Sequence, residues 1–264
     1  MTGPKIFQPE YYERMRALEA ASWWNAGMRD VAERLLRRAR LPRRGVLLDA
    51  GCGSGQTMEW FRRSHPEWRT VGVDLAKEGL RAARIAGDNQ VLGGSVLALP
   101  LPDASVDAII SLDVLQHLPL DGGDAEALLE FRRVLRPGGW LLVRTNAQSW
   151  PRIPDDPAYS FHKYAAPELR EVLQSAGFRV DRLGRLNALL GLAEIPRELR
   201  GQRRHGAGYV GLLAEVPRPD PAWHLKRCWL GAEGMLVANG FSLPLGRTLL
   251  ALAQVQEEAS HARD

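Results

Sequence analysis

A glycine-rich segment and a later acid form the most chemically informative pattern in the sequence. The apolar pair Leu47-Leu48 leads to Asp49 and then to Gly51-Cys52-Gly53-Ser54-Gly55. A second apolar run ends at Asp74, about 20 residues beyond the turn, which is the spacing expected when a carboxylate binds a ribose. Glycines at alternate positions let the backbone pass close to a ligand, because they carry no Cβ. The pattern therefore predicts a site for an adenosine-containing cofactor.

The positions of the glycines separate two kinds of cofactor. A dinucleotide fingerprint needs its third glycine three residues after the second, and that position holds Gln56. Asp49 would repel a pyrophosphate, whereas a carboxylate there can accept hydrogen bonds from an α-ammonium group. The sequence thus favours S-adenosylmethionine over a nicotinamide dinucleotide. A nicotinamide-dependent oxidoreductase is the first alternative.

Length and composition limit the class of protein. The chain has 264 residues, a net charge of +4 and 35 scattered Lys and Arg residues, so we expect no nucleic-acid partner. It contains no run of about 18 apolar residues, so we expect no membrane span. Its start lacks the basic and apolar blocks of a secretory signal. One of the two cysteines lies in the glycine turn, which argues against a structural disulfide and fits a cytoplasmic protein.

Alternating strand and helix patterns position these residues. The sequence predicts strands at 46–49, 70–74, 91–94, 106–112, 140–145, 178–186 and 248–253, with helices at 57–64, 77–86, 124–135 and 167–176. This alternation predicts an α/β fold, with a Rossmann-like, doubly wound and mostly parallel seven-stranded sheet. Two helices are expected within residues 9–40. Another follows Asp220-Pro221, since Leu225, Trp229, Ala232 and Leu236 recur at helical spacing.

We divide the chain into four parts. Residues 1–42 form an N-terminal helical cap, 43–186 the cofactor-binding Rossmann-like core, 187–240 a helical lid insertion, and 241–264 the final strand and C-terminal tail. The insertion is too long for a simple connection. Aromatic residues in the cap and the insertion suit a largely apolar pocket, so we expect both to cover the reacting atoms.

Several motifs resemble, in order, those of class I S-adenosylmethionine-dependent methyltransferases. They are Leu48–Gly55, Gly72–Asp74, Leu99–Asp107, Leu112–Leu118 and Leu135–Gly139, with Tyr164, Glu168-Leu169 and Ala176–Phe178 completing the set. The resemblance covers about residues 43–186. More loosely, Trp23-Trp24 and Pro244–Thr248 resemble the ends of an uncharacterised bacterial subgroup, close to methyltransferase type 11.

The resemblance implies how S-adenosylmethionine and its product S-adenosylhomocysteine are held. Ser95 departs from the family, which usually has an acid there for the adenine amino group, but its hydroxyl can still accept a hydrogen bond. The expected residues are Asp49, Gly51, Cys52, Gly53 and Gly55 around the methionine part, Asp74 on the ribose, Leu75, Ser95, Val96 and Leu97 around the adenine, and Leu112 and Asp113 beside the sulfonium.

Methyl transfer needs an aligned nucleophile and the exclusion of water, so the enzyme needs no covalent nucleophile. A base is needed only if the acceptor must lose a proton. The candidate catalytic residues are His117, His162 and Tyr164, and the candidate acceptor contacts are Tyr11, Trp23, Trp24, His117 and Trp223. Each of these side chains has packing or a local hydrogen bond as its alternative role.

A metal and the acceptor complete the expectations. A metal-dependent O-methyltransferase could use the cluster of Asp113, His117, Asp121 and Asp124 as ligands. Asp is common in polar loops because its side chain stabilises turns, so we expect no metal. The expected acceptor is a small molecule, either natural-product-like, a sugar or lipid-linked. The sequence leaves open a monomer or a homodimer, and a non-catalytic protein that binds the cofactor is the second alternative.

Overall fold

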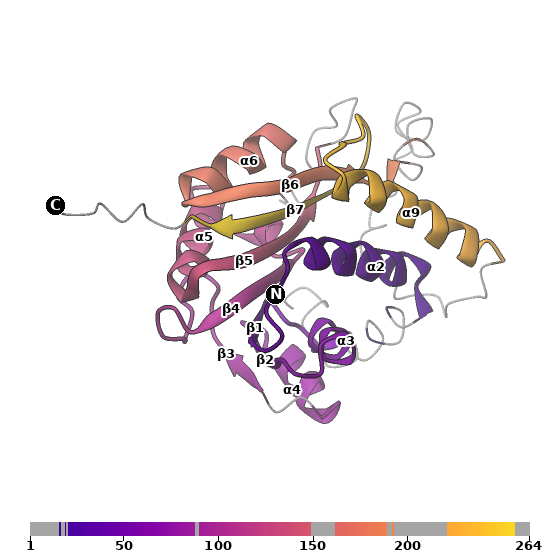
Figure 1. Ribbon diagram of the computed structural model, residues 1–264. Helices are drawn as coiled ribbons and strands as arrows, with labels where there is room; N and C mark the ends of the chain where they lie inside the picture. Colours follow the sequence, from indigo (N-terminus) through magenta and orange to yellow (C-terminus); the bar gives the residue numbers. More distant parts are fainter. Residues whose placement is uncertain are drawn as a thin grey trace, which may run out of the picture.

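A seven-stranded sheet forms the centre of the computed structural model (Figure 1). The strands are β1 (Val46–Ala50), β2 (Arg69–Asp74), β3 (Val91–Gly93), β4 (Val106–Leu112), β5 (Leu135–Asn146), β6 (Phe178–Leu186) and β7 (Thr248–Val255). Their order is β3-β2-β1-β4-β5-β7-β6, and only β7 runs antiparallel to its neighbours. The predicted Rossmann-like, mostly parallel sheet is therefore confirmed. The structure describes residues 16, 19, 21–87, 90–148, 162–188, 192 and 221–256.

Helices cover both faces of this sheet (Figure 1). They are α2 (Trp23–Arg38), α3 (Gln56–Ser64), α4 (Lys77–Ile85), the short 3-10 helix η2 (Leu115–His117), α5 (Gly123–Val134), α6 (Ala166–Ser175) and α9 (Trp223–Ala238). One core packs α5 and α6 on one face, and a second packs α2, α3 and α9 on the other. Within the described residues, no helix is both long and apolar enough to cross a membrane.

Strand β5 is longer than the sequence indicates. It begins at Leu135, which the helical pattern assigns to the preceding helix, and α5 ends one residue earlier at Val134. The expected helix end is therefore wrong by one residue. Leu135 takes an extended conformation, with φ −72° and ψ 138°, and pairs with Val106 across a register shift. Pro137 cannot continue a helix, so the chain enters the sheet before it.

Helices α2 and α9 lie side by side (Figure 1), and glycines set their separation. A Cβ at Gly27 would lie 2.8 Å from Leu230 Cδ2, and one at Gly234 would lie 2.3 Å from Val31 Cγ2. Arg227 of α9 also donates two hydrogen bonds to Asp30 of α2, at 2.6 and 2.9 Å. The helix of the insertion is thus held against the helix of the N-terminal cap.

The buried face of α9 differs from the stripe that reveals the helix in the sequence. Leu225, Trp229 and Leu236 recur at helical spacing, yet they are exposed by 73, 48 and 41%. The residues that face the core include Leu230 and Val237. Periodicity predicts the helix correctly, but the close approach at Gly234 decides which face is buried.

Replacing Gly234 by Ala should lower the free energy of unfolding by about 1–3 kcal/mol, because overpacking a filled contact is destabilising. Gly231→Ala is the matched control in the same helix, since nothing lies within 4 Å of a Cβ at that position. The control should be neutral or more stable by up to about 1 kcal/mol, as Ala favours helix more than Gly. Urea unfolding compares the two, and equal stabilities would contradict the close packing.

Candidate functional site

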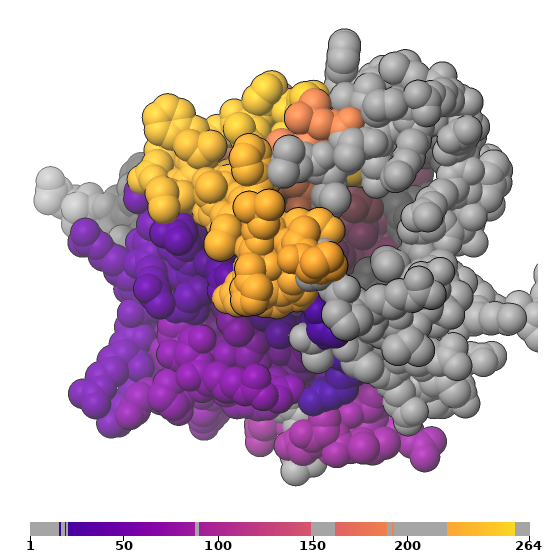
Figure 2. Space-filling model, turned by 90° about the vertical axis from the view of Figure 1, so that its right-hand side faces the viewer, coloured from indigo at the N-terminus to yellow at the C-terminus, as the bar shows by residue number. Residues whose placement is uncertain are grey.

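The carboxyl ends of the parallel strands meet at one edge of the sheet, where ligands bind in open α/β folds. Ala50, Asp74, Leu112, Asn146 and Leu186 are the last residues of five of these strands. Helices α2 and α9 both begin beside this edge, and Trp24 near the start of α2 reaches the residue after β6. Figure 2 faces the side at which they begin and shows α9, in orange, against the indigo segment that contains α2.

The glycine loop after β1 passes close to the segment after β4. Gly51 has φ +86°, and a Cβ there would lie 2.2 Å from Val114 Cγ2. The backbone N–H groups of Gly51 and Cys52 both donate to Val73 O, at 2.8 and 3.1 Å. The side chain of Cys52 is buried beneath Gly72, so this residue offers the edge only its backbone. The loop therefore presents mainly its backbone, and a side chain at Gly51 would collide with Val114.

Asp74 lies at the end of β2 and faces this loop. Its Oδ2 accepts a hydrogen bond from Gly53 N at 2.8 Å, and its Oδ1 accepts one from Ala76 N at 2.7 Å. Each carboxylate oxygen keeps further acceptor capacity, which suits a pair of ribose hydroxyls. The next residue, Leu75, is 78% exposed, and an exposed apolar side chain at this point suits the face of an adenine ring. The donors and acceptors present thus fit an adenosine cofactor.

The turn after β3 contains Ser95, where the family usually has an acid. Ser95 Oγ accepts a hydrogen bond from Leu97 N at 3.1 Å, and the turn closes with a hydrogen bond from Ala98 N to Ser95 O at 3.2 Å. Val96 is buried, so it can present only its backbone to a ligand. The local hydrogen bonds fix this turn and leave the proton of the Ser95 hydroxyl available to donate.

A partly buried ion pair joins the ends of β4 and β5. Asp113, at φ +60°, accepts two hydrogen bonds from Arg144, at 2.6 and 3.1 Å. The guanidinium lies 4.7 Å from the ring centroid of Trp24, which is a cation–π arrangement. Asp113 is therefore charge-compensated by Arg144 at the point where the sequence expects it beside the sulfonium.

Trp24 is itself fixed by a polar network at the end of β6. Its indole N–H donates to Asn187 Oδ1 at 3.0 Å, and Asn187 Nδ2 donates to Thr248 Oγ1 at 2.7 Å. The carboxylate of Glu233, in α9, accepts hydrogen bonds from Asn187 N at 2.6 Å and from the indole N–H of Trp229 at 2.7 Å. Side chains from α2, β6, β7 and α9 thus hold one another in place.

His117 follows β4 and His162 follows β5, and a backbone hydrogen bond from His162 to Gln116 brings the two segments together. Burial lowers the pKa of His117, and the charge of Asp113 partly opposes that shift. His117 is therefore neutral, in the form that accepts a proton, at pH 7. The ring of His162 is held by Glu168, with 2.7 Å between Nε2 and Oε1, and its backbone N–H donates to Gln116 O.

Tyr164, the third candidate base, lies in the core. It is 1% exposed, and its hydroxyl donates to Asp124 at 3.0 Å. Burial raises the pKa of this phenol, with a further contribution from the charge of Asp124. A buried phenol that keeps its proton and already serves as a donor cannot act as a base at neutral pH. This geometry favours a packing role for Tyr164.

Of the remaining candidates, Tyr11 lies outside the described residues, as does most of the insertion 187–240, whereas Trp23 and Trp223 are described. Trp223 donates its indole N–H to Ala21 O at 3.1 Å, and Trp23 lies 5.8 Å below the ammonium of Lys226. These contacts join the insertion to the cap. Within the described part of the chain, no three His, Cys, Asp or Glu side chains converge on a metal position.

The sequence reasoning did not select Arg144, Asn187 or Glu233. Arg144 had a signal, because it is a charged residue within the otherwise apolar run at 140–145. Such a residue in a buried strand needs a partner, so a carboxylate should be sought near it. Asn187 and Glu233 had no such signal, because Asn187 only marks the start of the insertion and Glu233 lies in the predicted helix outside its apolar stripe.

The sequence matches known proteins over the core and beyond it. The sequence model of a family described as "Methyltransferase domain" matches residues 48–143. A Mycolicibacterium smegmatis protein is 34% identical over 67% of this chain and 66% of its own length. A Mycobacterium tuberculosis protein is 32% identical over 73% of this chain and 67% of its own length. Both are named as S-adenosylmethionine-dependent methyltransferases.

Solved structures share the fold at lower sequence identity. A Haloferax volcanii methyltransferase, in complex with the activator Trm112, has a TM-score of 0.61 and 20% identity. The match covers 97% of this chain and all of that one. In sequence, the chain spans about two thirds of the length of the curated relatives named above.

Proposed function

The chain belongs to the class I S-adenosylmethionine-dependent methyltransferases, and on this premise we propose that it methylates a small-molecule acceptor at the carboxyl edge of the sheet. When bound, S-adenosylmethionine supplies a methyl group activated by a sulfonium. We assign the ribose to Asp74 and the adenine to Leu75 and the turn at Ser95. The loop 49–55 would surround the methionine part.

The side-chain arrangement at the ends of β4 and β5 carries the acceptor proposal. Trp24 is locked over Arg144, and Arg144 is locked on Asp113, so this end of the site is rigid, apolar on one side and charged on the other. Ligand sites of this kind hold small molecules through a few fixed polar groups and an aromatic surface. The beginnings of α2 and α9 border it, which supports the cap and the insertion as the parts that select the acceptor.

Two relatives carry names that specify acceptors. A malonyl-[acyl-carrier protein] O-methyltransferase of Erwinia pyrifoliae is 40% identical over 44% of this chain, and a trans-aconitate 2-methyltransferase of an Azoarcus species is 36% identical over 49%. The name of the Azoarcus relative specifies an acid as acceptor, and that of the Erwinia relative specifies a malonyl group on an acyl-carrier protein. A carboxylate is already ionised at neutral pH, so its methylation needs alignment but no base. An acid or a hydroxyl compound is therefore the acceptor that we test first.

We assign His117 to the acceptor. It follows β4 and lies beyond the residues that we assign to the cofactor, and its lowered pKa keeps it neutral. A neutral imidazole can accept a proton from a hydroxyl acceptor as the new bond forms, or it can orient an acid by a hydrogen bond. His162 is held by Glu168, so it is better suited to support the loop than to move a proton.

Asp74→Ala should weaken binding of S-adenosylhomocysteine by roughly 2–4 kcal/mol, because it removes hydrogen bonds to a charged acceptor. Asp121→Ala, which removes the same charge from an exposed position near the same edge, is the matched control and should change affinity by less than about twofold. Isothermal titration calorimetry gives both values. Unchanged affinity in Asp74→Ala, with the fold intact by circular dichroism, would rule out this placement.

A turnover assay that detects S-adenosylhomocysteine tests the acceptor class. We expect release of this product with small carboxylic acids or hydroxyl compounds, and no release above the acceptor-free rate with RNA or with a protein extract. The Asp74→Ala variant controls for contaminating activity. Turnover confined to RNA or protein acceptors would overturn the proposal while leaving the cofactor site intact.

His117→Gln should lower turnover of a hydroxyl acceptor by about 10²-fold and leave cofactor affinity within about threefold. His65→Gln is the control, since His65 lies at the end of α3 and contacts Glu33. In the wild type, kcat/KM should decrease on the acid side with a midpoint below pH 6.5. Burial lowers the pKa of His117, and protonation of His117 removes the base. This decrease should vanish in the variant. Full activity of His117→Gln at every pH would refute the role.

A further inference from the structure

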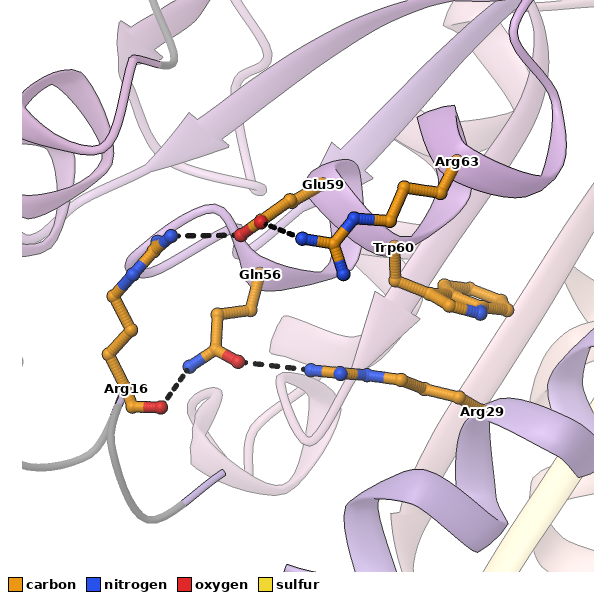
Figure 3. Close-up of a pocket in the computed structure, with 6 residues that line it drawn as sticks. All are labelled: Arg16, Arg29, Gln56, Glu59, Trp60 and Arg63. Atoms are coloured by element: carbon orange, nitrogen blue, oxygen red, sulfur yellow. Dashed lines mark hydrogen bonds and ion pairs between the residues drawn. The ribbon is translucent and has the colours of Figure 1, made fainter. Parts of the chain in front are cut away.

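A polar pocket lies on the side of α3 that faces α2 (Figure 3). It has a volume of about 170 Å³ and is lined by Arg16, Arg29, Gln56, Glu59, Trp60 and Arg63. The last four recur on one face of α3, and Arg29 comes from α2. The pocket therefore combines three guanidinium groups and one carboxylate, an excess of two positive charges, with an indole as its apolar wall.

The single carboxylate is already shared between two of the arginines. Arg16 donates to Glu59 Oε2 at 2.8 Å, and Arg63 donates to Glu59 Oε1 from the next turn of the helix. In Figure 3 both guanidinium groups point toward this carboxylate. Glu59 therefore has little capacity left to compensate a third guanidinium.

Among the residues that the structure describes, Arg29 is the pocket guanidinium with no carboxylate within hydrogen-bonding distance. Its Nη2 donates to the neutral carboxamide of Gln56, with 3.0 Å to Oε1. Burial lowers the pKa of Arg29; the charges of Arg144 and Arg63 act in the same direction, and those of Glu19 and Glu59 oppose it. A half-buried guanidinium beside other cations is held at an electrostatic cost that a bound anion would relieve.

We propose that this pocket binds a small oxyanion, a carboxylate or a phosphate group, through Arg29 with support from Arg16 and Arg63. A guanidinium presents a planar fork of N–H donors that matches either group in a bidentate manner. The volume suits an anionic group or a small acid, because sites for whole drug-sized ligands are larger, at about 300 Å³ or more. The indole of Trp60 gives the carbon atoms of such an acid a surface to contact.

The pocket adjoins the cofactor loop at the start of α3. Arg16 Nη1 donates to Ser54 O at 3.0 Å, and Gln56, the first residue of α3, donates from Nε2 to Arg16 O at 3.1 Å. An anion held here would contact residues that follow the loop, rather than the residues that we assign to the cofactor. The anion could come from a free small acid or phosphate, or from an anionic group of a larger ligand.

Calorimetric titration of the full chain with inorganic phosphate, and separately with malonate, at constant ionic strength tests the site. Arg29→Gln should lower the affinity for both anions at least tenfold. Arg34→Gln is the matched control, since Arg34 lies exposed in the same helix, outside the pocket, and loses the same charge. Glu59→Gln should strengthen the binding of both anions, because it removes the one negative charge in the pocket lining. Equal loss in Arg29→Gln and Arg34→Gln, or no binding by the wild type, would overturn the proposal.

A second pair of ligands distinguishes this anion site from the binding site of the cofactor carboxylate. S-Adenosylhomocysteine carries an α-carboxylate, and 5′-methylthioadenosine does not. If the pocket is independent, Arg29→Gln should leave the affinity of both within about threefold. A tenfold loss for S-adenosylhomocysteine with no loss for 5′-methylthioadenosine would assign Arg29 to the cofactor carboxylate and overturn a separate anion site. Tighter phosphate binding by Glu59→Gln, with cofactor affinity unchanged, would support it independently.

Discussion

The architecture of the site depends on the close approach of Gly51 to Val114. The segments that leave the neighbouring strands β1 and β4 meet there with no room for a side chain between them. The same loop is tied to β2 by two hydrogen bonds to Val73 O. Interiors packed this densely have no slack, so a Cβ at this point would displace one of the two segments. The contact thereby sets where Asp74 and Asp113 stand relative to the loop.

A chain of polar contacts extends this rigidity to the parts outside the shared fold. The pair Asp113–Arg144 is capped by Trp24, and Trp24 is fixed through Asn187 to Glu233 in α9. Buried charged groups cost desolvation energy and are often no more stabilising than apolar ones of similar size. Their value lies in geometry, because each hydrogen bond admits few alternatives. The network gives α2 and α9 one defined position at the edge of the sheet.

Helix α2 contributes to two environments of different chemistry. Near its start, Trp24 compensates and covers a guanidinium that already has a carboxylate. Less than two turns later, Arg29 enters the pocket beside α3, where its hydrogen-bond partner among the described residues is the neutral amide of Gln56. The charge of Arg144 raises the electrostatic cost of Arg29, so the two environments interact through the same helix. Helix α2 is thus an electrostatic element of the protein as well as a cover for the sheet.

The sequence by itself determined the order of the elements, the glycine loop and the acid at the end of β2. These features are local: apolar runs specify strands, glycines specify a turn, and parallel strands bring their ends to one edge. Most predicted strand bounds are within two residues of those observed, and β5 differs because Leu135 pairs with Val106 rather than continuing α5. The family of the protein followed from the same local motifs.

Only the tertiary structure decided which side chains face which partner. Tyr164 follows β5 as a catalytic candidate would, yet its ring is buried and its hydroxyl meets Asp124, forty positions away in the chain. The apolar stripe of α9 is exposed, because Gly234 allows the opposite face to reach Val31. The pairing of Arg144 with Asp113 and the excess charge around Arg29 likewise arise between distant residues. Spacing along a chain fixes periodicity and local turns, whereas burial, charge compensation and close approach depend on contacts that no single segment contains.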